Sequence, residues 1–165
     1  MLDQVDVEQE IDATRPEEFE AILELTRRVA VFNEEEVDTV EELLEGYAYS
    51  PEESGYYFLS CRRQGQLAGF ACWGPRALSG SGYDLYWVCA DPDLHGQGIG
   101  KALLRAVEDA VRACEGIWIV IETSDTDHYA PARRLYERSG YTLAMHLPDF
   151  YYPGDGMCTF TKKVR

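Results

Sequence analysis

Apolar and polar residues follow a regular pattern in successive segments of the chain. Val5 to Ile11 alternates apolar with acidic residues, which predicts a first strand. Thr14 to Glu17 has the form of a capping box with Pro16 in the first turn, so a helix is expected to begin there. Apolar residues then recur at helical spacing, and a second, acidic helix is predicted to end near Gly46.

Strands dominate the rest of the pattern. Residues 56–62 and 67–73 are aromatic or apolar and flank a short Gln-Gly-Gln turn, which predicts an antiparallel hairpin. Further strands are predicted at 83–90, 117–121, 141–146 and 157–162, helices after Gly100 and at 131–138, and a loop at 148–156. This order predicts an α/β (α+β) fold with a central mixed, mostly antiparallel sheet flanked by helices.

Length and charge narrow the class of protein. A chain of 165 residues closes one hydrophobic core, so residues 1–165 are expected to form a single domain. The net charge of -15 repels a phosphate backbone, so no nucleic-acid partner is expected. The acidic excess is interpreted as a solvated face.

Cysteine and histidine usage points to a protein without a metal site. The five cysteines include no CxxC pair and several lie in apolar runs, which indicates buried free thiols in a reducing compartment. The three histidines are far apart in sequence, so no metal is expected. The first residues have no apolar signal region and no stretch is long enough to span a bilayer, so a cytoplasmic protein without a membrane partner is expected.

A glycine-rich turn at residues 96–101 carries the strongest chemical signal. Gly96, Gly98 and Gly100 separate a strand from a helix and remove the β-carbons that would keep a ligand away. The free N–H groups of the helix start, with Lys101 beside them, suit a pyrophosphate. A glycine-rich turn without a ligand is the structural alternative.

The surroundings of this turn resemble a known family. Asp91-Pro92, the turn itself and residues 101–104 are similar to the acetyl-CoA-binding motif of GNAT acetyltransferases, with His95 at the usual Arg or Gln position. Residues 129–141 resemble the second signature of that family, in which a tyrosine on a short helix precedes a Gly-aromatic pair. Tyr129 stands where many members have asparagine.

The resemblance implies acetyl-CoA as co-substrate and assigns residues to it. The backbone of Val88, Cys89 and Ala90 would pair with the pantetheine arm, and a backbone N–H of Cys89 or Ala90 would stabilise the oxyanion. Tyr136 falls where members place the general acid that protonates the departing sulfur. The residues expected around the pyrophosphate are His95, Gly96, Gln97, Gly98, Ile99, Gly100 and Lys101.

Two carboxylates are candidates for the general base. Strand alternation predicts that Asp84 shares a sheet face with Tyr86, Val88 and Ala90. Glu122 is expected at the end of an apolar strand, matching a glutamate that some members use as base. Each is alternatively a solvated or salt-bridged strand-end residue, with Arg133 or Arg134 as partner.

The predicted function is acetyl-CoA-dependent N-acetylation of a primary amine, either a small molecule or a peptide N-terminus, by direct transfer. The acceptor site is expected between the first helices, the loop at 80–83 and the loop at 148–156, with an aromatic wall from Phe150, Tyr151 and Tyr152. A catalytically silent CoA-binding regulatory module is the alternative. Analogy with the family also suggests a homodimer.

Overall fold

The structure is a computed structural model that describes residues 9–165. The predicted first strand, Val5 to Ile11, begins outside the described residues, and its described part belongs to a strand that ends two residues later. The elements in chain order are β1 (Gln9–Ala13), η1 (Pro16–Glu18), α1 (Phe19–Arg28), α2 (Glu34–Tyr49), α3 (Pro51–Ser54), β2 (Tyr57–Arg63), β3 (Gln66–Pro75), β4 (Gly82–Ala90), η2 (Pro92–Leu94), α4 (Ile99–Ala113), β5 (Trp118–Ser124), η3 (Asp127–Tyr129), α5 (Ala130–Arg138), β6 (Thr142–Tyr152) and β7 (Asp155–Lys163).

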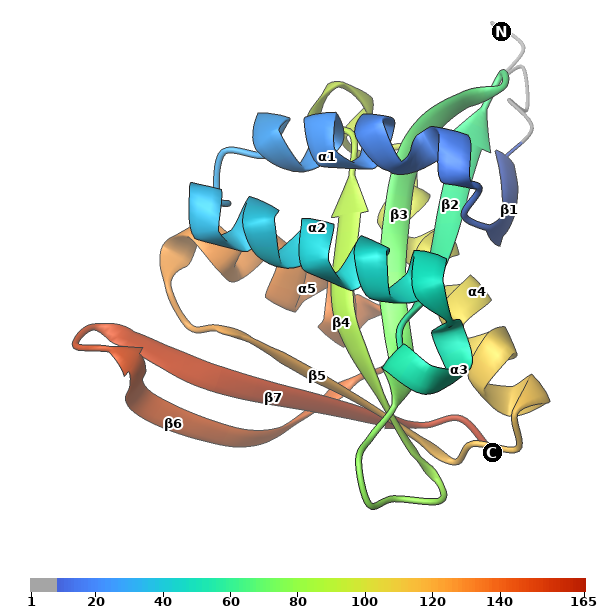
Figure 1. The fold of residues 1–165 in the computed structure, drawn as a ribbon. Coiled ribbons are helices and arrows are strands. Elements are labelled where there is room, and N and C mark those ends of the chain that lie inside the picture. The colour runs from blue at the N-terminus through green and yellow to red at the C-terminus, as the bar shows by residue number, and fades with distance from the viewer. Residues whose placement is uncertain (1–8) are drawn as a thin grey trace, which may run out of the picture.

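A mixed sheet of the order β1-β2-β3-β4-β5-β7-β6 forms the middle of the molecule (Figure 1). The β4–β5 pair is parallel and the other neighbouring strands are antiparallel. The predicted fold class, a mostly antiparallel mixed sheet flanked by helices, is therefore confirmed.

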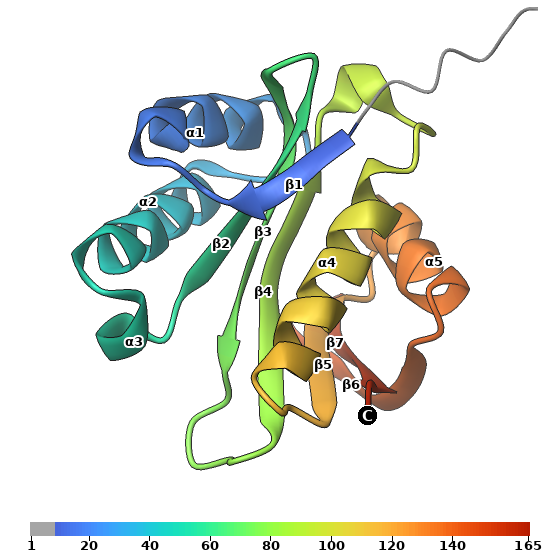
Figure 2. The same ribbon diagram turned by 90° about the vertical axis from the view of Figure 1, so that its right-hand side faces the viewer.

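Helices cover both faces of the sheet, as the view along it shows (Figure 2). Helices α1 and α2 pack on one face over β2, β3 and β4, through a cluster that includes Ile22, Val40, Phe58 and Phe70. Helices α4 and α5 pack on the opposite face, where Leu103 and its neighbours form the larger cluster. The sheet is therefore buried on both sides at β2–β4.

The start of the first helix differs from the sequence prediction. The capping residue is Arg15 rather than Thr14, and its backbone N–H donates to Glu18 Oε2 at 2.8 Å. The Thr14 hydroxyl instead shares a hydrogen bond of 2.7 Å with that of Ser60 on β2. The expected hydroxyl cap is wrong because this side chain is used to join the end of β1 to the sheet.

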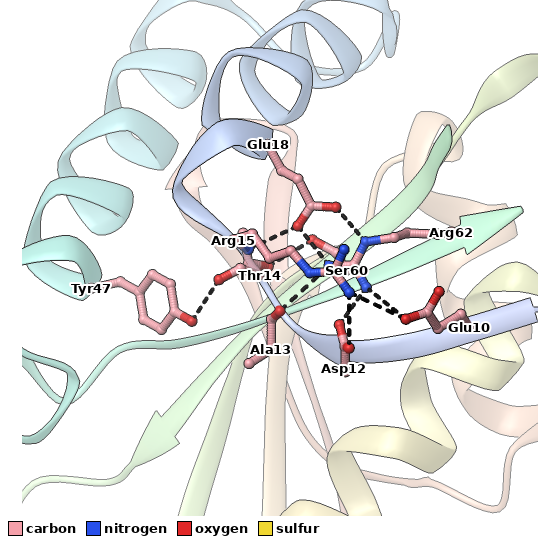
Figure 3. A network of polar contacts seen from close by, with 9 residues as sticks. All are labelled: Glu10, Asp12, Ala13, Thr14, Arg15, Glu18, Tyr47, Ser60 and Arg62. Carbon is pink, nitrogen blue, oxygen red and sulfur yellow. Dashed lines mark hydrogen bonds and ion pairs between the residues drawn. The ribbon is translucent and has the colours of Figure 1, made fainter. Parts of the chain in front are cut away.

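A buried arginine holds the first segment against β2 (Figure 3). The side chain of Arg62 is 4% exposed and donates to both oxygens of Glu18, at 2.5 and 2.7 Å. It also forms an ion pair with Asp12. Hydrogen bonding to Arg62 holds the pKa of Asp12 below its usual range. Burial acts to raise the pKa of Glu18, but the hydrogen bonds from Arg62 and from the Arg15 backbone, together with the charge of Arg62, lower it. These carboxylates compensate the charge of the buried guanidinium.

Two further predictions of element boundaries are corrected. The second helix continues past Gly46 to Tyr49, where Ser50 ends it and caps the short α3. Most of the expected loop at 148–156 is instead strand: β6 extends to Tyr152, which pairs with Asp155 of β7 after an irregularity that begins at Leu147. Gly154, with φ of +84°, provides the positive-φ position of the tight turn between them.

Candidate active site

The candidate site begins where β4 and β5 separate (Figure 1). The two strands pair only through residues Gly82–Asp84 and Trp118–Val120. Beyond that point β4 remains paired with β3 on one side, while β5 follows β7 away from it. The side of residues 85–90 that faces β5 therefore lies outside the β4–β5 ladder, and its backbone groups need another partner.

Backbone direction decides which β4 amides face this gap. The Asp91 N–H donates to Ala68 O at 2.8 Å, so it points toward β3. Successive N–H groups of a strand point to opposite sides, so that of Cys89 also points toward β3, and those of Val88 and Ala90 point into the gap.

A cradle of backbone amides lies at the end of β4. Gly96 and Gly98 both have φ of +77°, a conformation that favours glycine, and no atom lies within 4 Å of a β-carbon built on either. Gly98 caps α4, and the first helical bond runs from Ala102 N to Gly98 O at 3.0 Å. The N–H groups of residues 99–101, all within the described chain, precede that bond and have no acceptor in the helix. The open glycine positions and positive helix end fit an anion such as a diphosphate.

Contacts on both sides fix the position of this helix start. A β-carbon on Gly69 of β3 would lie 2.8 Å from Ile99 Cγ2, and one on Gly100 would lie 2.8 Å from Leu135 Cδ2 of α5. Both glycines therefore permit close packing of α4. In the preceding turn, Arg28 donates to Asp91 at 2.9 Å, and this contact lowers the pKa of Asp91.

The other predicted cradle residues have distinct surroundings. The side chain of Ile99 is buried in the core, so only its N–H is available to a ligand. Gln97 Oε1 accepts from Arg63, which holds this side chain toward β2. His95 and Lys101 are exposed. Lys101 helps to line a small hollow of about 190 Å³ together with Leu104, Arg105, Glu108, Arg138, Ser139 and Lys162.

Tyr136 lies on the α4–α5 side of the sheet. It is 6% exposed and belongs to the same cluster as Val88 and Ala90. Its ring centroid is 5.7 Å from that of Phe160 and 6.3 Å from that of Tyr141. Burial raises the pKa of Tyr136, so the phenol keeps its proton at neutral pH.

A β-bulge at Tyr86 overturns one prediction about Asp84. Adjacent residues of β3, Cys72 and Trp73, pair with Trp87 and Leu85, so Tyr86 is an extra residue in β4. Trp87 and Cys89 consequently pack toward α1 and α2, and Val88 and Ala90 toward α4. Asp84 therefore lies on the face opposite Val88 and Ala90.

Asp84 and Glu122 nevertheless meet in one cleft, on the face that carries α1 and α2. The cleft has a volume of about 530 Å³. It is lined by Arg76, Ala77, Asp84, Leu85, Tyr86, Val120, Glu122 and Tyr151. The first helices and the loop at 80–83, which the sequence suggested as walls, contribute no lining residue, whereas Tyr151 does.

Arg76 bridges the two candidate bases. Its Nη1 lies 2.6 Å from Asp84 Oδ1 and its Nη2 lies 3.7 Å from Glu122 Oε1. The Asp84 side chain is 17% exposed and that of Glu122 is 45% exposed. Burial raises the pKa of Asp84 in spite of the nearby guanidinium, which acts in the opposite direction.

The surroundings of Glu122 differ from the sequence prediction. It lies within β5 opposite Thr159, not at the strand end, because β5 continues to Ser124. Arg133, one of its expected partners, donates to backbone oxygens of Ser124 and Thr126 at 2.7 Å each. Arg76 was missed because a hairpin, rather than a motif, brings it to Asp84.

Cys89 is enclosed in the α1–α2 cluster. Burial raises the pKa of its thiol to about 12, so it is protonated and unreactive at neutral pH. Within residues 9–165, no three His, Cys, Asp or Glu side chains gather into a group that suits a metal ion. The helices of that same range include none that is long and apolar enough to cross a membrane.

Comparisons with known proteins agree with this geometry. Residues 17–141 match the model of the acetyltransferase (GNAT) family. A solved protein from Desulfovibrio desulfuricans, assigned to the GNAT family, shares 31% identity, with 96% of this chain and 100% of that chain covered and a TM-score of 0.92. No curated protein matches the chain.

Two more distant structures share the fold. The aminoglycoside 6'-N-acetyltransferase from Enterococcus faecium is 18% identical, with a TM-score of 0.75 and coverage of 94% of this chain and 97% of that chain. The yncA protein from Salmonella typhimurium, solved with acetyl-CoA, is 22% identical, with a TM-score of 0.76 and coverage of 95% and 94%.

The fold and the family match define the class of protein as an acetyl-CoA-dependent acyltransferase. More particularly, the chain belongs to the GNAT acetyltransferase family.

Proposed function

We propose that the protein transfers an acetyl group from acetyl-CoA directly to a primary amine of a small molecule or a peptide N-terminus. The observation that carries this proposal is the free side of β4. At one end of it lies the amide cradle of residues 96–101, and at the other lies the carboxylate cleft. A donor held by the first and an amine held by the second would meet beside the same strand.

The cradle residues suit the phosphates of coenzyme A. Gly96 and Gly98 leave room for an anion, and the amides of residues 99–101 point toward it. Lys101, Arg105 and Arg138 add positive charge along the adjoining hollow. The N–H groups of Val88 and Ala90 face the gap and would pair with an extended amide-containing arm as a neighbouring strand does.

The bound co-substrate supplies a thioester: the amine nitrogen forms a bond to its acyl carbon, the carbon–sulfur bond breaks, the amine loses a proton and the thiolate gains one. Ala90 N–H would donate to the carbonyl oxygen as negative charge develops there. Its direction into the gap favours it over Cys89, whose N–H points toward β3.

The two proton transfers fall to groups on opposite faces of the sheet. Tyr136, kept protonated by burial, would donate to the sulfur. Asp84 or Glu122 would accept the proton of the amine, directly or through water. Of the two, Asp84 is favoured because its raised pKa makes it the stronger base.

The proposal is tested by incubating the protein with acetyl-CoA and a panel of amines. We expect thiol release that depends on the amine, and a product whose mass has increased by one acetyl group. Tight binding of acetyl-CoA without release of its thiol in the presence of any amine would instead support a catalytically silent CoA-binding module.

A further inference from the structure

In the cleft on the α1–α2 face, a cationic side chain of the protein, Arg76, lies beside the two candidate bases. Arg76 follows β3, and its guanidinium lies 2.6 Å from Asp84 and 3.7 Å from Glu122. Its side chain is 45% exposed, so the ion pairs rather than burial hold it there. An exposed ion pair of this kind contributes little stability, so another cation can displace it.

The charges of the cleft are not balanced. Arg76 is the one cationic side chain among the eight residues that line it, all in the described part of the chain, and it faces two carboxylates. One guanidinium, at 2.6 Å from Asp84 and 3.7 Å from Glu122, leaves one negative charge of this pair uncompensated. Proton abstraction requires one carboxylate, which leaves the other to bind a second positive charge.

The walls of the cleft suit the carbon skeleton of such a cation. Tyr86 and Tyr151 supply aromatic rings, whose faces attract ammonium groups, and Val120 supplies apolar surface. The ring of Tyr86 is held by an edge contact with Tyr56, with centroids 5.4 Å apart. The volume of about 530 Å³ accommodates a small organic molecule.

We propose, on the basis of the proposed function, that the acceptor is a small organic cation with at least two basic nitrogens, and that Arg76 occupies its site until the acceptor displaces it. One nitrogen is the amine to be acetylated and the other binds the carboxylate that is not used as base. Arg76 is then a specificity-determining residue: its positive charge competes with the acceptor.

An alternative role for Arg76 is to bind a carboxylate of the acceptor, which would predict a different class of acceptor. If its guanidinium bound the carboxylate of an amino acid, the acceptor would carry a negative charge into a cleft with Asp84 and Glu122. The net charge of -15 adds to that repulsion and attracts polyvalent cations. The electrostatics of the whole protein and of the cleft therefore agree on a cationic acceptor.

Three amines with the same four-carbon chain separate these roles. Putrescine has an ammonium at its far end, butylamine a methyl group and gamma-aminobutyrate a carboxylate. We expect kcat/KM, measured by thiol release from acetyl-CoA, to decrease in that order. An activity that is highest with gamma-aminobutyrate, or equal for all three amines, contradicts the proposal.

The variant Arg76→Gln tests the competition directly. We expect its KM for putrescine to fall about tenfold, because a like charge is removed from the site. Arg76→Lys, which keeps the charge, should stay closer to the parent protein. Arg27→Gln is the control, since it makes the same change in net charge at an exposed position of α1. An increase in the KM for putrescine in Arg76→Gln overturns the proposal.

Equilibrium binding separates this proposal from the proposed function. Calorimetric titration of putrescine into the protein, without acetyl-CoA, should show binding that is tighter in Arg76→Gln than in Arg27→Gln. If that binding is present while no amine is acetylated, the cation site stands and the proposed function fails. If putrescine does not bind and is not preferred as acceptor, the cation site is wrong even where another amine is acetylated.

Discussion

The ring of Tyr136 packs against those of Phe160 and Tyr141, and burial raises the pKa of its phenol, which therefore stays protonated at neutral pH. Cys89 is buried as well, and its thiol also stays protonated. The consequences differ because a phenol donates its proton to a thiolate, whereas a protonated thiol is a poor nucleophile. At the scale of single residues, burial therefore supports a general acid at Tyr136 and excludes a cysteine nucleophile at Cys89.

Replacement of Tyr136 by phenylalanine tests the general acid. The ring and its contacts remain, so we expect the folded structure and acetyl-CoA affinity to be kept while kcat falls about a hundredfold. Pre-steady-state and steady-state thiol release measure this directly. An unchanged kcat at saturating substrate, in a reaction limited by chemistry, would remove the assignment.

At the scale of single elements, the start of α4 depends on a glycine with positive φ. Gly98 has positive φ and open space around it. Gly65, in the β2–β3 turn, has φ of +76° and equally open surroundings. The two positions therefore share the same backbone requirement, and only Gly98 belongs to the amide cradle.

Alanine substitution at each glycine separates strain from ligand binding. Both Gly98→Ala and Gly65→Ala should lose about 1 kcal/mol of unfolding free energy, because an L-residue is strained at positive φ. Only Gly98→Ala should also weaken acetyl-CoA binding, by tenfold or more, as measured by calorimetry. Equal affinities in the two variants would show that the cradle does not hold the co-substrate.

A charge network around Arg62 adds to the β1–β2 ladder and to the packing of Ile11 in holding β1. In Arg62→Met, Asp12 and Glu18 lose their main partner, and we expect a loss of about 3 kcal/mol in unfolding free energy at neutral pH. The folded-state pKa values of both carboxyls are lowered, so the network stabilises the protein above their ordinary pKa values. This contribution is lost as the pH falls through the lowered values.

Chemical denaturation at several pH values checks both statements. The difference in unfolding free energy between the parent protein and Arg62→Met should shrink as the solution becomes acidic. A difference that stays constant down to acid pH would mean that Arg62 acts through packing alone.

The sequence predicted most elements because their periodicity and turn residues are local signals. The glycine turn predicted the open cradle and helix start later found at Gly96 and Gly98. The bulge at Tyr86 was not predictable, since it is defined by pairing with β3 rather than by a residue type. Arg76 was missed because no residue pattern marks it: the β3–β4 hairpin brings it to Asp84, and the pairing of β4 with β5 brings it to Glu122.

At the scale of the whole molecule, the two proposed binding regions lie on opposite faces of the sheet. The helix start and Tyr136 lie on the α4–α5 side, and the carboxylate cleft lies on the other. The bulge in β4 contributes to this division because it reverses the alternation of side chains between Leu85 and Trp87. A donor and an acceptor bound in this way approach the gap from opposite sides, which is consistent with direct transfer in a ternary complex.

The short β4–β5 ladder also has a consequence for amide hydrogen exchange. The N–H groups of Val88 and Ala90 face the gap outside that ladder, so their hydrogens should exchange rapidly with solvent deuterium in the free protein. A bound pantetheine arm would then protect these two amides selectively, while the Cys89 amide, directed toward β3, would be protected in both states. Binding of the co-substrate would thus be detected as an alternating pattern of deuterium uptake along β4.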